Sequence, residues 1–155
     1  MNAAQNTKTD ASIERLLNSL EQSLSSPLNN LSKIELAELF NAGQQALIEG
    51  RLDDALGIYL VLQQARPDES AYRFGYALTL QQMGEIKQAG EHYTIAFALD
   101  PTDAACAFRL GECLAALGYT VDAHDALHAA IQLCDIPRND PKIRELADNL
   151  IRRLN

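Results

Sequence analysis

Apolar residues recur every three to four positions along most of the chain, which is the spacing of one face of an α-helix. Near the start, this stripe consists of Ile13, Leu16, Leu17, Leu20 and Leu24. Near the end, it consists of Ile143, Leu146, Ala147, Leu150, Ile151 and Leu154. Alanine and leucine dominate from residue 11 onward, whereas β-branched residues are few. Because alanine and leucine favour helices over strands, the pattern predicts an all-α protein.

Between the two stripes, the sequence repeats with a period of 34 residues. The residues that recur at this period are Gly50, Gly84 and Gly118, then Ala55, Ala89 and Ala123, and then Pro67 and Pro101. Such a period, with small residues at fixed places, resembles the tetratricopeptide repeat, whose unit is a pair of antiparallel helices. The resemblance predicts a solenoid of three helix pairs, with repeats at about 36–69, 70–103 and 104–137.

Each repeated residue has an expected role in its helix pair. The glycine follows the first helix, where a left-handed backbone is least costly for a residue without a Cβ atom. The alanine lets the paired helices approach closely, and the proline ends the second helix. In the third repeat, Asp135 replaces the proline and Pro137 stands two residues later.

The chain on either side of the repeats is expected to form the ends of the solenoid. Ser32, with Glu35 three residues later, predicts a capping box at the start of the first pair. Asp140 followed by Pro141 predicts the start of a capping helix over 140–154, which repeat arrays need to cover their last apolar face. The expected organisation is a flexible N-terminus over 1–10, an N-terminal helix and linker over 11–31, and a repeat domain over 32–155.

The N-terminal stripe between Ile13 and Leu24 lies outside the repeats and needs an apolar partner. We expect this helix to mediate dimerisation through a symmetric two-fold contact. The alternative is that it folds back onto the first repeat.

A second stripe lies about a third of a turn away from the interior face on the first helix of each repeat. It consists of Ala37, Phe40, Gln44 and Leu47, then Ala71, Phe74, Leu78 and Gln81, and then Ala105, Phe108, Glu112 and Ala115. In tetratricopeptide arrays this stripe lines the concave groove, so the resemblance implies a peptide-binding surface with three phenylalanines as apolar sockets. The alternative is that the phenylalanines pack neighbouring repeats together. The stripe has no lysine or asparagine of the kind that clamps a C-terminal carboxylate in one subclass of these arrays.

Composition and charge narrow the classes of partner. The 155 residues include 13 basic and 21 acidic side chains, which gives a net charge of −8. An acidic chain is poorly suited to bind nucleic acid or anionic lipid, and no apolar run approaches the length of a membrane span. The polar N-terminus has no apolar signal region, and the cysteines number three. These features predict a cytoplasmic protein with no nucleic-acid partner and no membrane insertion.

Candidate reactive residues give no sign of enzyme chemistry. Cys106 and Cys113 are seven residues apart on one helix face, which favours two small buried side chains over a metal pair. His124 and His128 have a spacing that can hold a metal, but no third ligand is evident, so we expect exposed histidines. The acidic residues that start second helices are expected to act as caps and dipole partners; they are Asp53, Asp54 and Asp122. No phosphate loop or nucleophile elbow is present, so we expect no enzyme activity, no cofactor and no metal.

Two segments sharpen the resemblance. They are Leu28–Asn29–Asn30–Leu31–Ser32 before the first repeat and Phe108–Arg109–Leu110–Gly111–Glu112–Cys113–Leu114 in the third. With the lone N-terminal helix, they resemble the class II chaperones of bacterial type III secretion over roughly residues 12–135. The resemblance implies a cytoplasmic chaperone that holds an extended N-terminal segment of a hydrophobic translocator in the groove. Many such chaperones dimerise, and some also bind transcriptional regulators. The alternative function is a scaffold or regulatory adaptor for other proteins.

Overall fold

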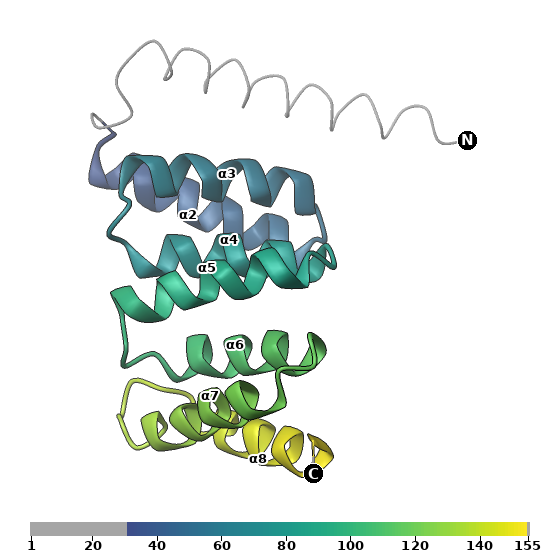
Figure 1. The fold of residues 1–155 in the computed structure, drawn as a ribbon. Coiled ribbons are helices and arrows are strands. Elements are labelled where there is room, and N and C mark those ends of the chain that lie inside the picture. Colours follow the sequence, from purple (N-terminus) through teal and green to yellow (C-terminus); the bar gives the residue numbers. More distant parts are fainter. Residues whose placement is uncertain (1–30, 155) are drawn as a thin grey trace.

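The computed structural model describes residues 31–154, which form seven helices and no strand (Figure 1). The helices are α2 (Lys33–Ile48), α3 (Leu52–Ala65), α4 (Ser70–Gln82), α5 (Ile86–Leu99), α6 (Ala104–Ala116), α7 (Thr120–Leu133) and α8 (Lys142–Leu154). The predicted all-α class is confirmed. The expected flexible N-terminus and the stripe expected to mediate dimerisation lie outside the described residues.

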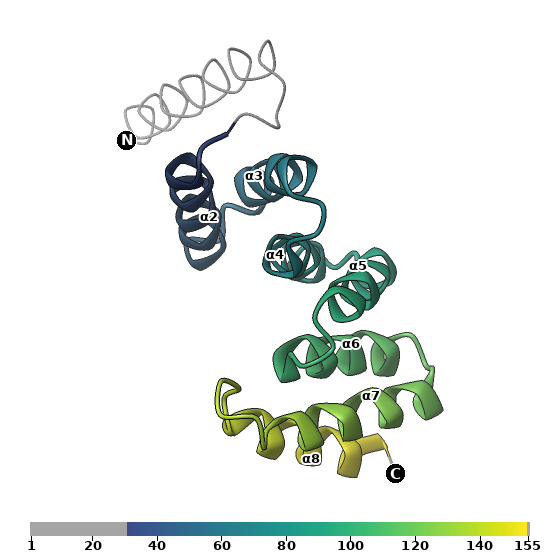
Figure 2. The same cartoon turned by 90° about the vertical axis from the view of Figure 1, so that its left-hand side faces the viewer.

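The helices stack as consecutive pairs along an arc. Figure 2 shows α2, α4 and α6 toward the inner side of this arc, while α3 and α5 lie on the outer side. Three apolar clusters run through the stack, centred on α2 with α3, on α4 with α5, and on α6 with α7 and α8. The fold is therefore a solenoid of three helix pairs closed by the single helix α8.

The three turn glycines adopt the predicted left-handed backbone. Their φ angles are 72° at Gly50, 85° at Gly84 and 83° at Gly118. In the first pair, the amide of Arg51 donates to the carbonyl of Ala46 at 2.8 Å. The amide of Gly50 donates to the carbonyl of Leu47 at 3.2 Å. This pairing is a Schellman motif, and it satisfies carbonyls that the helix end would leave without partners.

The alanines that recur every 34 residues are buried between helices. Ala55, Ala89 and Ala123 are each 0% exposed. One turn later, each pair places a large buried side chain, and these are Tyr59, Tyr93 and Leu127. The expected close approach of paired helices is thus confirmed at the residues that the period marks.

The helix starts agree with the sequence in part. Ser32 and Glu35 form the predicted capping box, with amide-to-oxygen distances of 2.8 and 3.2 Å. The carboxylate of Asp140 accepts from the amide of Lys142 at 2.9 Å before α8. The expectation that aspartates cap α3 and α7 is wrong, because the capping positions are held by Arg51 and Tyr119. The aspartates lie in the first turns instead, which is the place expected of partners for the helix dipole, and they are Asp53, Asp54 and Asp122.

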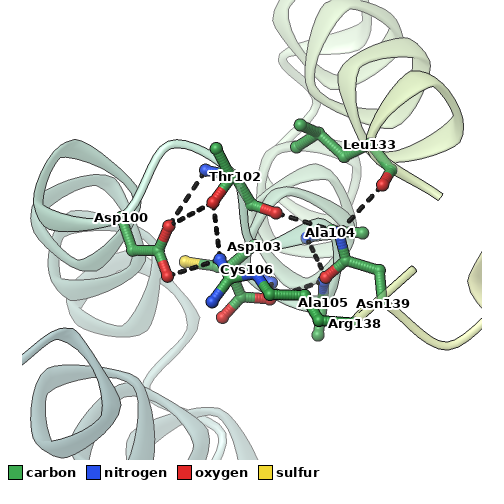
Figure 3. A network of polar contacts seen from close by, with 9 residues as sticks. All are labelled: Asp100, Thr102, Asp103, Ala104, Ala105, Cys106, Leu133, Arg138 and Asn139. Carbon is green, nitrogen blue, oxygen red and sulfur yellow. Dashed lines mark hydrogen bonds and ion pairs between the residues drawn. The ribbon is translucent and has the colours of Figure 1, made fainter. Parts of the chain in front are cut away.

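A polar network fixes the loop before α8 to the loop before α6 (Figure 3). The Nη2 atom of Arg138 donates to Asp100 and to the hydroxyl of Thr102, both at 2.6 Å. The amide group of Asn139 donates to the carbonyls of Thr102 and Leu133 at 2.9 and 2.8 Å. Its oxygen accepts from the amide of Ala104, the first residue of α6. Polar contacts therefore join the loop that leads into α8 to the third pair, whereas α8 itself packs against that pair through apolar residues.

Candidate functional site

A pocket of about 410 Å³ lies between α2 and α4. These two helices lie toward the inner side of the arc (Figure 2). Its lining residues are Phe40, Gln44, Leu47 and Ile48 of α2, Tyr59 of α3, and Ala71, Phe74, Gly75, Leu78 and Gln82 of α4. Most of these side chains are apolar or aromatic, and no charged side chain is among them. The pocket therefore suits an apolar group brought to it by a partner.

Six of the residues that the sequence assigned to the groove line this pocket. They are Phe40, Gln44, Leu47, Ala71, Phe74 and Leu78. The structure places them together because α2 and α4 occupy the same position in consecutive pairs. Their role in peptide binding stays a prediction.

Four lining residues were not singled out from the sequence. Ile48 and Gln82 each follow the last groove position of their helix by one residue, and Ile48 is 79% exposed. Tyr59 lies on the second helix of its pair, outside the stripe assigned to the groove, and Gly75 carries no side chain that a pattern could mark. The one sequence signal that could have identified any of these four residues is Ile48, an apolar residue that belongs to neither stripe of its helix.

Aromatic packing builds the floor of the pocket. The ring of Phe40 meets the ring of Tyr59 edge-on, with centroids 6.1 Å apart, and lies 5.5 Å from that of Tyr72. Tyr59 can occupy this place because Gly75 has no side chain. A Cβ atom on Gly75 would lie only 2.1 Å from the Tyr59 ring. Burial raises the pKa of the Tyr59 hydroxyl to about 12, so this group is neutral at physiological pH. The floor is therefore aromatic and uncharged.

The third phenylalanine does not share the environment of the first two. Phe108 is only 7% exposed and belongs to a core cluster with Ile143 and Ala147 of α8. Phe74, by contrast, is half-buried and packs edge-on against Tyr93, with ring centroids 5.4 Å apart. The inner face thus presents two phenylalanines to the pocket, while the third is covered by its neighbours.

Two other predicted groove residues belong to a polar cluster between α4 and α6. The hydroxyl of Tyr93 donates to the side-chain oxygen of Gln81 at 2.9 Å. The amide nitrogen of Gln81 donates to Oε2 of Glu112 at 3.2 Å, and Arg109 donates to the same oxygen at 2.8 Å. Burial raises the pKa of Tyr93, which keeps its hydroxyl protonated as a donor. Side chains from three helices therefore meet here.

The remaining predicted groove residues flank these two places. Ala37 is exposed on α2, and Ile34, three residues before it, is 72% exposed. Ala105 and Ala115 are half-buried on α6. None of them lines the pocket.

The candidate reactive residues lie apart from the pocket. Cys106 and Cys113 are buried as predicted, and burial raises the pKa of their thiols to about 12 and about 11. The rings of His124 and His128 stack 6.2 Å apart. His128 is exposed as expected, whereas His124 is half-buried. Within residues 31–154, no three histidine, cysteine or acidic side chains gather as metal ligands would. In the same range, none of the helices combines the length and the apolar character that crossing a membrane requires.

The amino-acid sequence matches no protein-family model and no curated protein, whereas the fold is shared with solved structures. PcrH from Pseudomonas aeruginosa is 23% identical, with a TM-score of 0.76 over 83% of this chain and 98% of PcrH. The type III secretion translocator chaperone SycD from Yersinia enterocolitica is 23% identical, with a TM-score of 0.73 over 82% of this chain and 88% of SycD. The first TPR of Spaghetti, bound to an HSP90 peptide, is 19% identical, with a TM-score of 0.69 over 80% of this chain and 93% of that domain.

PcrH has been solved in complex with the chaperone binding region of PopD and with that of PopB. SycD has been solved in an alternative dimer. The chain therefore has the fold of a tetratricopeptide-type helical array, and the structures that share this fold include chaperones of type III secretion translocators, the class that its sequence resembles.

Proposed function

We propose that this protein is a cytoplasmic chaperone of bacterial type III secretion. It binds an extended segment of a hydrophobic translocator in its concave groove and keeps that client soluble until secretion. The observation that carries this proposal is the uncharged apolar pocket between α2 and α4. Its likeness in fold to PcrH, which has been solved with two chaperone binding regions, supports the same reading.

The physical need for such a partner comes from the client. A translocator carries apolar segments that are meant for a membrane, and such segments aggregate when they are exposed to water. A binding protein can prevent this without any reaction, provided that it offers apolar sockets and remains soluble itself. The pocket floor made by Phe40 and Tyr59, on a chain of net charge −8, meets both requirements.

Self-association is part of the proposal. The stripe expected to mediate it consists of Ile13, Leu16, Leu17, Leu20 and Leu24. A symmetric two-fold contact between two such stripes would remove their apolar surface from water.

The test is co-expression with PopD or PopB, followed by measurement of the soluble fraction of the translocator. We expect the wild-type chain to move the translocator from the pellet to the supernatant and to co-purify with it. Phe74→Ala should weaken this effect because Phe74 lines the pocket. Ile95→Ala is the matched control, because Ile95 is 43% exposed on α5 and is not among the lining residues.

The opposite result is equally clear. A translocator that pellets to the same extent with and without the chain would refute the chaperone function. Binding that leaves the client's solubility unchanged would instead favour an adaptor.

A further inference from the structure

The polar cluster between α4 and α6 has an open side that its internal contacts do not use. Both contacts to Glu112 fall on one carboxylate oxygen, Oε2, which accepts from Arg109 and from Gln81. The side chains of Arg109 and Glu112 are 39% and 29% exposed. Within residues 31–154, no hydrogen bond reaches Oε1 of Glu112, and Arg109 donates through Nη1 alone. Oε1 of Glu112 and the remaining N–H groups of Arg109 therefore have no hydrogen-bond partner among the described residues, and both side chains are partly exposed. The Arg109 guanidinium also lies over the ring of Phe108, 5.8 Å from its centroid.

The charges of this cluster indicate which group it would bind. Arg109 and Glu112 form an ion pair at 2.8 Å, so the cluster carries no net charge. A carboxylate would gain the guanidinium but would be repelled by Glu112, and an ammonium group would meet the reverse situation. An amide avoids both penalties, because its N–H can donate to Oε1 and its carbonyl can accept from the guanidinium.

The cluster lies beside the apolar pocket. Gln81 follows the pocket residues Phe74 and Leu78 at helical spacing, so the three share one face of α4. Gln81 follows Phe74 by seven residues, which places it about 10 Å further along the helix axis at 1.5 Å per residue. An extended chain covers this distance in about three residues.

We propose that Arg109 and Glu112 form an amide-binding subsite next to the α2–α4 pocket. A bound segment places an apolar side chain in the pocket and an amide group, about three residues away, on the ion pair. This inference rests on the proposed function, and it adds a specificity element to the groove. The subsite fixes the direction and the register in which the segment binds, while the pocket supplies its apolar contact.

The probes are synthetic peptides that span the chaperone binding regions of PopD and PopB. In one set, each backbone amide in turn is replaced by an ester, which removes a single N–H donor. In a second set, each Asn or Gln is replaced by Ala, which removes a side-chain amide. Each peptide is titrated against the wild type, Glu112→Ala and Phe74→Ala, with folding checked by circular dichroism.

Glu112 also bridges α6 to α4, so its removal can weaken binding through structure alone. The decisive readout is therefore the coupling between peptide and protein changes. We expect one ester, about three residues from the apolar anchor, to weaken binding to the wild type about tenfold. The same ester should have no further effect on Glu112→Ala, yet keep its full effect on Phe74→Ala.

Each outcome has one meaning. Coupling of Glu112 to an ester assigns the amide to the main chain, and coupling to an Asn or Gln substitution assigns it to a side chain. Both support the subsite. Peptides that bind the wild type but show no coupling to Glu112 overturn the subsite and leave the proposed function standing. Peptides that fail to bind the wild type overturn both.

Discussion

The two halves of the inner face derive from the same repeat but present different chemistry. Between α2 and α4, two phenylalanines border an open apolar pocket. Between α4 and α6, the face carries the polar contacts of Gln81 and Glu112, and Phe108 is buried against residues of α8. The position in the repeat fixes which way a side chain points. The next helix in the stack decides whether that side chain remains accessible.

This difference separates binding from stability. An open phenylalanine can contribute to a partner, because its apolar surface is still in contact with water. A covered phenylalanine has lost its contact with water on folding, so it has no further apolar surface to bury against a partner. We therefore expect changes in the α2–α4 half to affect affinity and changes in the α6–α8 half to affect stability.

The largest effect should come from removing the element that closes the second half. Deleting residues 140–155 would expose the cluster that contains Phe108, Ile143 and Ala147. We expect a loss of about 3–5 kcal/mol in the free energy of unfolding, the range for losing large core side chains. Thermal unfolding followed by circular dichroism measures this loss. An unchanged melting temperature would show that α8 is not a cap.

A matched pair of substitutions tests the comparison directly. Phe108→Ala should cost about 3–5 kcal/mol of stability, because it leaves a cavity in the core. Phe74→Ala should cost about 2 kcal/mol of peptide binding, or about thirty-fold in affinity. The measurements are denaturant unfolding and titration with the PopD region. Equal effects of the two substitutions on affinity would mean that the groove extends across all three repeats.

The smallest effect concerns the network before α8. The hydrogen bond from Arg138, followed by that from Thr102, holds the pKa of Asp100 below its usual value. Because the folded pKa is depressed, this contribution to stability is present above the unfolded pKa of about 4 and is lost as pH falls through the folded pKa. Arg138→Gln should therefore lower the melting temperature at pH 6 by more than at pH 3. Arg153→Gln, an exposed change on α8, is the control. A constant difference between the two pH values would contradict the pairing.

Local features of the fold could be predicted from the sequence because their causes lie within a few residues. A glycine such as Gly84 is marked by its period, and the turn it makes requires a left-handed backbone. The capping box of Ser32 and Glu35 is likewise closed within one turn of helix. The aspartates of α3 and α7 were misplaced because a cap and a first-turn residue differ by only one or two positions.

The site could be predicted only in part. The stripe that contains Phe40 and Phe74 was visible in the sequence, since a repeat places equivalent residues on one face. The sequence alone thus determined the all-α class, the helix pairs, the turns and the helix face from which six residues line the pocket. The tertiary structure decided that Phe108 is covered and that Gln81 meets Glu112, 31 residues away along the chain. The physical reason is that exposure and pairing depend on which helices pack together, and a periodic pattern carries no information about the helix that ends the stack.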